Sequence, residues 1–432
     1  MRPKQLHPTA WRVFVALFVM LVVFPKGGFR LGGLPITWGY LMLFGSLVAL
    51  MPYRMYVVKA LWVRRQIVAL GTLVPFALIF FYALGGYGAS DSYQKNGVVS
   101  TSISLIFLPI VFLWFYPPML PLLNRTQVMK CLRYCVLITA LFGIFLFFWR
   151  PFTGINIHIP FLTTNGSDAG DPAATSNNSR GFFFKLISTY NNGNIYGAAT
   201  LILLRLFDEA TPRRWERWVV RTALFLTLSR TIWAGLIFNE LLSLGAALLS
   251  QAQSFPRLRL GRTAKLTVAA VAFGPIFFLA SKMMQRNEAS FLLDPTLGGR
   301  TYQFQHLGEV PFFPNFQSHY MITEIVYLSS VNEFGYAGSV AVTILLLGPI
   351  GILLLDKRAL QDPIRMAAFK GLVLYAFLCT SDGAIALIPV AAFYWFTYMI
   401  FLFGLPGRQP HVLGQRQFVA IASIPQERSL LT

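Results

Sequence analysis

Three arginines beside apolar segments are the side chains best suited to binding a charged substrate. Arg180 opens RGFFFKLISTYNNGNIYG, Arg230 lies in LTLSRTIWAG, and Arg300 lies in GGRTYQFQH. An arginine at the mouth of a helix in an apolar medium is destabilising unless it meets an anion or a carboxylate. A guanidinium binds phosphate oxygens in pairs and stays charged, so three converging arginines would suit a diphosphate. Each arginine can instead pair with a nearby acid or extend to lipid headgroups.

Two groups that could accept a proton lie in QSHYMITEIVYLSSVNEFGYAG, ahead of another apolar segment. His319 or Glu324 would be a general base able to take a proton from a hydroxyl. The alternatives are that His319 is an ordinary loop residue and that Glu324 is the ion-pair partner of an arginine. The sequence leaves both alternatives open.

Amides and aromatic rings beside the arginines could bind sugar hydroxyls. Asn191 and Asn194 follow Tyr190 where the first of these segments re-enters an apolar run, and Tyr302 follows Arg300. An asparagine side chain both donates and accepts hydrogen bonds, and an aromatic ring can stack on a sugar. Asparagines also cap helices, and Asn194 stands just before the helical pattern IYGAATLILL.

The composition is typical of a membrane protein. Of the 432 residues, 56% are hydrophobic and 12% are charged, and the formal net charge is +20. In a soluble protein that charge would suggest nucleic acid, but here the basic residues stand between apolar runs, which indicates membrane topology and no nucleic-acid partner. The three cysteines have no metal-ligand spacing, so we expect no metal site.

Apolar runs predict an all-α, polytopic membrane protein with about twelve transmembrane helices in a single transmembrane domain, residues 1–432. The run at 219–229 is too short to cross alone and predicts a partial helix. The predicted helices are 11–24, 35–52, 67–84, 98–117, 134–149, 195–207, 219–229, 231–250, 266–284, 326–355, 366–380 and 384–404.

The distribution of lysine and arginine predicts the orientation. If the N-terminus is cytoplasmic, most basic residues fall in cytoplasmic connections, as the positive-inside rule requires. The even number of helices then places the C-terminus in the cytoplasm as well. Two long segments, about 150–194 and 285–325, would lie outside, and long external loops commonly carry function.

Together, these segments resemble the O-antigen ligase and O-antigen polymerase superfamily, which are membrane glycosyltransferases with a GT-C-like helical fold. The similar motifs are Arg180 followed by STYNNGNIYG, then LSRTIWAGLI, then Gly299-Arg300 with Tyr302, and finally TEIVYLSSVNEFGYAG. Ligases usually have a His-Asn pair where this chain has Thr323-Glu324, a departure that favours the polymerase.

The resemblance implies a mechanism and a location. The donor would be a glycan on undecaprenyl diphosphate at the periplasmic face of a bacterial inner membrane, and the acceptor would be another glycan or a lipid A core. Arg180, Arg230 and Arg300 would stabilise the leaving diphosphate. Glu324 or His319 would activate the acceptor hydroxyl, without a metal or other cofactor.

Two other classes of protein fit parts of the sequence. A transporter or lipid flippase would place ionisable groups within its spans, and Glu240 and Lys370 are the main charges inside apolar runs. A scaffold in a polysaccharide-export complex would need no convergence of the outer arginines.

Overall fold

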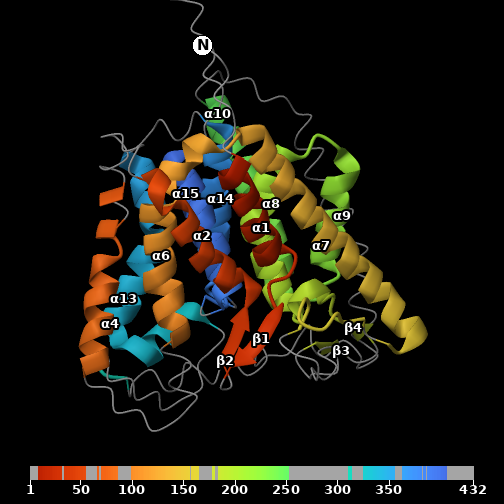
Figure 1. The fold of residues 1–432 in the computed structure, drawn as a ribbon, viewed down its shortest axis with the longest axis horizontal. Helices are drawn as coiled ribbons and strands as arrows, with labels where there is room; N and C mark the ends of the chain where they lie inside the picture. Colours follow the sequence, from red (N-terminus) through yellow and green to blue (C-terminus); the bar gives the residue numbers. More distant parts are fainter. Residues whose placement is uncertain are drawn as a thin grey trace, which may run out of the picture.

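The computed structural model is drawn in Figure 1, where the described residues are in colour. The described residues are 8–31, 34–54, 66–67, 70–85, 99–155, 157–164, 178–180, 183–252, 310–313, 325–355, 362–381, 383–385 and 387–405.

The described part is mostly helical, which confirms the all-α class. The long helices are α1 (Pro8–Val22), α2 (Trp38–Arg54), α4 (Val74–Gly85), α7 (Arg125–Thr153), α8 (Gly193–Ala210), α9 (Arg214–Phe225), α10 (Arg230–Ala252), α13 (Val326–Leu355), α14 (Pro363–Leu378) and α15 (Ile388–Phe403). Shorter helical pieces between α4 and α7 are η1 (Ile103–Phe107), α6 (Leu108–Ile110), η2 (Val111–Phe115) and η3 (Pro117–Leu122).

Most predicted helices are present, and several have bounds that differ from the prediction; α4, for example, begins at Val74 and not at residue 67, because residues 72–73 form a turn. The helix predicted at 134–149 begins at Arg125, where the Asn124 side chain accepts a hydrogen bond from the Thr126 amide. The helix predicted at 35–52 begins at Trp38, because residues 34–37 form a strand. The partial helix predicted at 219–229 is α9, with 12 residues. The helix predicted at 266–284 lies outside the described residues.

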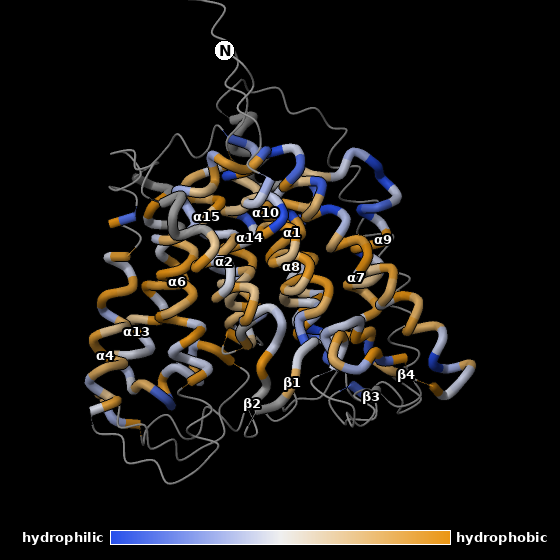
Figure 2. Tube along the Cα trace, in the orientation of Figure 1, coloured by the Kyte–Doolittle hydropathy of each residue, from blue (hydrophilic) through white to orange (hydrophobic). Residues whose placement is uncertain are grey.

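Two short antiparallel hairpins join the helices. Strand β1 (Gly28–Leu31) pairs with β2 (Leu34–Thr37), and β3 (Ser179–Arg180) pairs with β4 (Phe183–Phe184). Both lie at one end of the helix bundle (Figure 1), which we call the loop end because α1 and α14 end there and α8 and α10 begin there. The opposite end, where α7, α9 and α14 begin and α8 ends, we call the charged end. Figure 2 shows that hydrophilic residues gather at the charged end and that the helices between the two ends are largely hydrophobic.

The centre of the bundle is α15, whose described side chains are buried on every face, with α8 and α14 packed beside it. Glycine allows α8 and α14 to approach closely, since a Cβ atom at Gly371 would lie 2.3 Å from the carbonyl oxygen of Ile202. Small residues at such crossings are the usual means of close helix packing in membranes.

Two described helical segments, Arg125–Thr153 and Val326–Gly348, are long and apolar enough to cross a membrane. Exposed apolar side chains recur on one face of α7 at spacings of three or four residues. These are Tyr134, Ile138, Leu141, Phe145, Phe148 and Phe152, each 45% to 87% exposed. Large exposed apolar side chains also occur on α2, α4 and α13. A soluble protein rarely exposes so much apolar surface, so this belt favours a membrane protein.

Ion pairs hold the helices together at the charged end. The Arg133 guanidinium binds both carboxylate oxygens of Glu216, which joins α7 to α9, and the Glu216 side chain is only 1% exposed. Arg221 on α9 donates to both carboxylate oxygens of Asp208 on α8 at 2.9 Å. Burial keeps water away from these pairs, so neither partner can be removed without a large loss of stability.

We expect Gly371→Ala to destabilise the bundle by roughly 1–3 kcal/mol, because the added methyl forces α14 away from the α8 backbone. Thermal unfolding in detergent measures the change. Gly351→Ala on α13 is the matched control, since a Cβ atom there meets nothing within 4 Å. Equal melting temperatures for the two variants would contradict the close packing described here.

We expect Glu216→Ala to lower the free energy of unfolding by roughly 3–5 kcal/mol, because it leaves the Arg133 charge buried without its carboxylate. Chemical denaturation in detergent gives the value. Glu240→Ala is the control, since that carboxylate is 60% exposed and lies 3.4 Å from Arg221. We expect the control to lose less than about 1 kcal/mol, and an equally large loss there would show that burial does not decide the effect.

Candidate functional site

The polar residues of the first predicted site form a loop at the loop end of the bundle. Residues 178–180 and 183–192, which we call the site loop, include the strands β3 and β4 and the short helix η5 (Ser188–Tyr190), and they lead into α8. Described side chains from Lys185 to Tyr190 are all buried, so this part of the loop lies among the helices rather than over them.

The site loop is held in this position by hydrogen bonds that it donates to backbone carbonyl oxygens in α7 and α1 and just after α9. The Ser188 hydroxyl donates to the carbonyl oxygen of Thr139, halfway along α7, at 2.7 Å. The Leu186 amide donates to the carbonyl oxygen of Leu226, just after α9, at 3.0 Å. The Tyr190 hydroxyl donates to the carbonyl oxygen of Val22, the last residue of α1, at 3.1 Å.

Close contact with α7 also requires a glycine. A Cβ atom at Gly143 would lie 2.6 Å from the Leu186 side chain and 3.1 Å from that of Ser188. The loop therefore fits against α7 only where that helix has no side chain.

Asn178 connects the two ends of the site loop. Its side-chain nitrogen donates to the carbonyl oxygen of Asn191 at 3.0 Å, and its side-chain oxygen accepts from the Gly193 amide at 3.3 Å. Its backbone carbonyl accepts from the Lys185 amide at 2.8 Å. One buried asparagine thus satisfies polar groups from three parts of the loop, which would otherwise be unpaired in an apolar surrounding.

The asparagines after Tyr190 have different structural roles. Asn191 adopts the left-handed conformation (φ 58°), and its side-chain nitrogen donates to the carbonyl oxygen of Thr163 at 2.8 Å. Asn192 is the residue that caps α8, because its side-chain oxygen accepts from the amides of Asn194 and Ile195. The assignment of that cap to Asn194 was therefore wrong by two positions.

Asn194 instead binds a buried cation. The Lys185 ammonium, only 4% exposed as a residue, donates to the Asn194 side-chain oxygen at 2.9 Å. The two residues are brought together by the turn between β4 and α8. Lysine is seldom so deeply buried unless it has polar partners or binds an anion.

Further cations lie at the same end of the bundle as the site loop. Arg150, near the end of α7, places its guanidinium carbon 3.7 Å from the centre of the Phe184 ring. The backbone of Arg180 lies on β3, paired with Phe183. Lys26 follows α1 at the same end, and burial lowers its pKa. Lysine and arginine residues thus lie on the site loop, beside it on α7, and after α1 at the same end of the bundle.

Arg230 begins α10 beside the start of α8. A Cβ atom at Gly197 would lie 2.5 Å from the Ile232 side chain, so the first turns of the two helices are in direct contact. The next residue, Thr231, shares a 2.8 Å hydrogen bond with the hydroxyl of Ser381, just after α14. Two helix N-termini, each with a partial positive charge, thus lie together near Arg230 and Lys185.

The described carboxylates are concentrated elsewhere. Apart from Glu333, every acid in the described ranges lies toward the charged end. These are Asp208, Glu209, Glu216, Glu240 and Asp362. The described part of the loop end is therefore electropositive, and its chemistry favours an anion.

The structure places only some of the predicted site residues. Arg180, Arg230, Asn191 and Asn194 lie on or beside the site loop, as described above. Tyr190 is also there, but its ring is 2% exposed and packs against Tyr196, so its position supports the fold of the loop. Arg300, Tyr302, His319 and Glu324 lie outside the described residues.

Sequence reasoning missed Asn178, Lys185 and Arg150. A lysine alone in the apolar run FFFKLI was the available signal for Lys185. Asn178 stands in a polar stretch, and nothing in its spacing distinguishes it from its neighbours.

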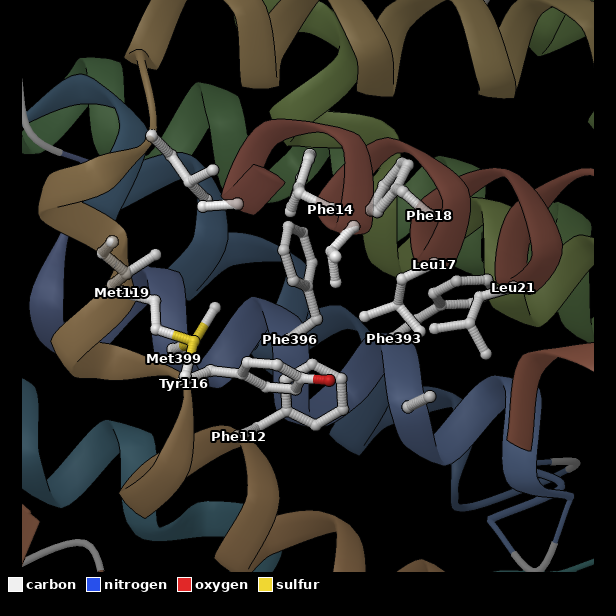
Figure 3. A pocket seen from close by; sticks show the side chains of 15 residues that line it. Phe14, Leu17, Phe18, Leu21, Phe112, Tyr116, Met119, Phe393, Phe396 and Met399 are labelled. Carbon is white, nitrogen blue, oxygen red and sulfur yellow. The ribbon is translucent and has the colours of Figure 1, made fainter. Parts of the chain in front are cut away.

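A separate cavity of about 50 Å³ lies between α1, the η2–η3 segment and α15. Its lining is almost entirely apolar, and the labelled residues in Figure 3 include Phe14, Phe112, Phe396 and Met399. The one labelled hydroxyl, on Tyr116, is hydrogen-bonded to Ser46. This cavity offers no group for catalysis and can accept only hydrocarbon.

Among the described residues, no group of three or more histidine, cysteine, aspartate or glutamate side chains could hold a metal ion. No family model matches the chain, and no curated protein matches it either.

We expect Asn178→Ala to loosen the site loop while the bundle stays folded, because two buried hydrogen bonds lose their side-chain partner. Each such loss is worth about 1–3 kcal/mol. Hydrogen exchange at the amides of Lys185 and Gly193 should become at least tenfold faster. Asn124→Ala, at the charged end, is the matched control and should affect only the start of α7. Unchanged exchange in the Asn178 variant would contradict its connecting role.

Proposed function

We propose that this protein is a membrane glycosyltransferase that transfers a glycan from undecaprenyl diphosphate to a sugar hydroxyl and so extends a polysaccharide by repeat units. The observation that carries the proposal is the group of cations around the site loop, together with the paired N-termini of α8 and α10. A diphosphate leaving group gains negative charge as its bond to the sugar breaks, and fixed positive charge in a site shielded from water stabilises that change.

Each residue has a defined part in the proposed reaction. The oxygen of the acceptor hydroxyl attacks the anomeric carbon, and the bond from that carbon to the diphosphate oxygen breaks. Arg180, Arg230 and Lys185 hold the departing diphosphate, with Arg300 as a further candidate from the sequence. Glu324 or His319 would take the hydroxyl proton, and Asn191, Asn194 and Tyr302 would contact the glycan.

The proposed placement in the membrane follows the distribution of charge. The charged end would face the cytoplasm with both chain termini, since lysine and arginine are concentrated on the cytoplasmic side of membrane proteins. The loop end, with the site loop, would face the periplasm of a bacterial inner membrane. About twelve helices would cross or enter that membrane, several of them only partly.

Ligation to a lipid A core is the alternative reaction with the same donor. The two reactions are separated by giving the purified protein, in lipid vesicles, undecaprenyl-diphosphate-linked repeat units as its only substrate. A ladder of lengthened glycans supports the polymerase. Transfer that requires an added lipid A core supports the ligase, and no transfer in either assay would overturn the proposal.

The transporter alternative depended on charges within the apolar segments, and Glu240 was the strongest example. In the structure its carboxylate is 60% exposed and lies 3.4 Å from Arg221 and 3.8 Å from Arg205. That position, in an ion-pair network toward the charged end, supports a structural role for Glu240.

We expect Arg230→Gln and Lys185→Met each to reduce glycan transfer by about 10²-fold, because each removes a positive charge from the leaving diphosphate. The rate of donor consumption in vesicles measures the effect. Arg12→Gln is the control, since that arginine is exposed on α1 toward the charged end. Wild-type rates in both site variants, with normal folding, would exclude the diphosphate role of these cations.

A further inference from the structure

The four arginines on and just before α9 divide into two pairs with different surroundings. Arg217 donates to the carbonyl oxygens of Asp208 and Thr211 at 2.9 and 2.7 Å, and Arg221 binds the Asp208 carboxylate. This pair faces α8 and ties its C-terminal end to α9. Arg213 and Arg214 are exposed, and Arg213 lies 3.9 Å from the Glu216 carboxylate.

Two exposed tryptophans lie within five residues of Arg213 and Arg214. Trp215 is 49% exposed and Trp218 is 69% exposed. Tryptophan at a membrane protein surface is typical of the headgroup level, where its ring meets lipid chains and its N–H meets water.

The exposed charge near these tryptophans is positive. Glu216 is the acid nearest in sequence, and its carboxylate is 1% exposed and bound by Arg133, although Arg213 also approaches it to 3.9 Å. Glu209, the exposed acid at the end of α8, interacts with the charges of Arg205 and Lys370. Neither carboxylate is therefore placed to neutralise Arg214.

Helix α7, which packs against α9, also has exposed basic and aromatic side chains near this end. Lys130 is exposed one turn before Arg133, the residue that joins α7 to α9, and Tyr134 begins the exposed apolar stripe of that helix. Basic and aromatic side chains thus form a border between the apolar stripe and the charged end.

We propose that Lys130, Arg213, Arg214, Trp215 and Trp218 form a binding site for the headgroup of an anionic phospholipid. The arginines and the lysine would bind the headgroup phosphate, and the tryptophans would lie at the level where the acyl chains begin. This inference depends on the membrane placement proposed above and is independent of glycan transfer, so failure of one leaves the other intact.

The lipid retained by the purified protein tests the site. Native mass spectrometry is used to titrate the full chain in detergent with phosphatidylglycerol and, in parallel, with phosphatidylcholine. We expect phosphatidylglycerol to bind more tightly, and we expect the double variant R213Q/R214Q to bind it roughly 30-fold more weakly. R12Q, which removes an exposed arginine from α1, should retain wild-type affinity.

Several outcomes would overturn the proposal. These are equal binding of both lipids, unchanged affinity in the double variant, or displacement of phosphatidylglycerol by millimolar inorganic phosphate, which would show a site for free phosphate. A change of oligomeric state in the double variant would instead assign the surface to a second copy of the chain. The single variant R214Q keeps the test decisive if loss of Arg213 disturbs Glu216, and we expect R214Q to bind about fivefold more weakly.

Discussion

The structure depends on satisfying the polar groups of a loop that is set among apolar helices. A buried backbone amide or carbonyl without a partner is strongly destabilising, and the helices have already paired their own groups. The site loop meets this constraint by donating hydrogen bonds to three backbone carbonyl oxygens. These belong to Val22 at the end of α1, Thr139 in the middle of α7 and Leu226 just after α9. The position of the loop is therefore fixed by backbone carbonyls of its surroundings, which accept from the Leu186 amide and from the side-chain hydroxyls of Ser188 and Tyr190.

The two ends of the bundle use positive charge differently. At the charged end, arginines bind buried carboxylates and hold α7, α8 and α9 together, as Arg133 does with Glu216. At the loop end, the contacts of the cations include an aromatic ring for Arg150 and an amide for Lys185. A ring or an amide orients a cation without neutralising it, which keeps the local potential positive.

Much of the fold could be predicted from the sequence, since apolar runs determine where helices can form. The prediction failed at residues 34–37, where an apolar run begins with a strand before the helix starts. It also failed at Arg125, because the first turns of α7 contain basic residues and do not continue the apolar run. The site could be predicted only as a segment. Lys185 and Asn194 become neighbours because the chain turns between β4 and α8. The sequence Asn191-Asn192-Gly193 is a local turn signal, but it does not specify which side chains the turn brings together.

The short helix α9 runs from the charged end to the site loop. It begins at Arg214, beside the exposed basic and aromatic surface, and is fixed to α7 through Glu216. It finishes just before Leu226, whose carbonyl oxygen holds the site loop. With 12 residues it would be about 18 Å long, too short to cross a bilayer, so the polar turn after it must lie within the bundle. Because α9 ends there, α10 begins at Arg230 beside the first turns of α8 and close to the site loop.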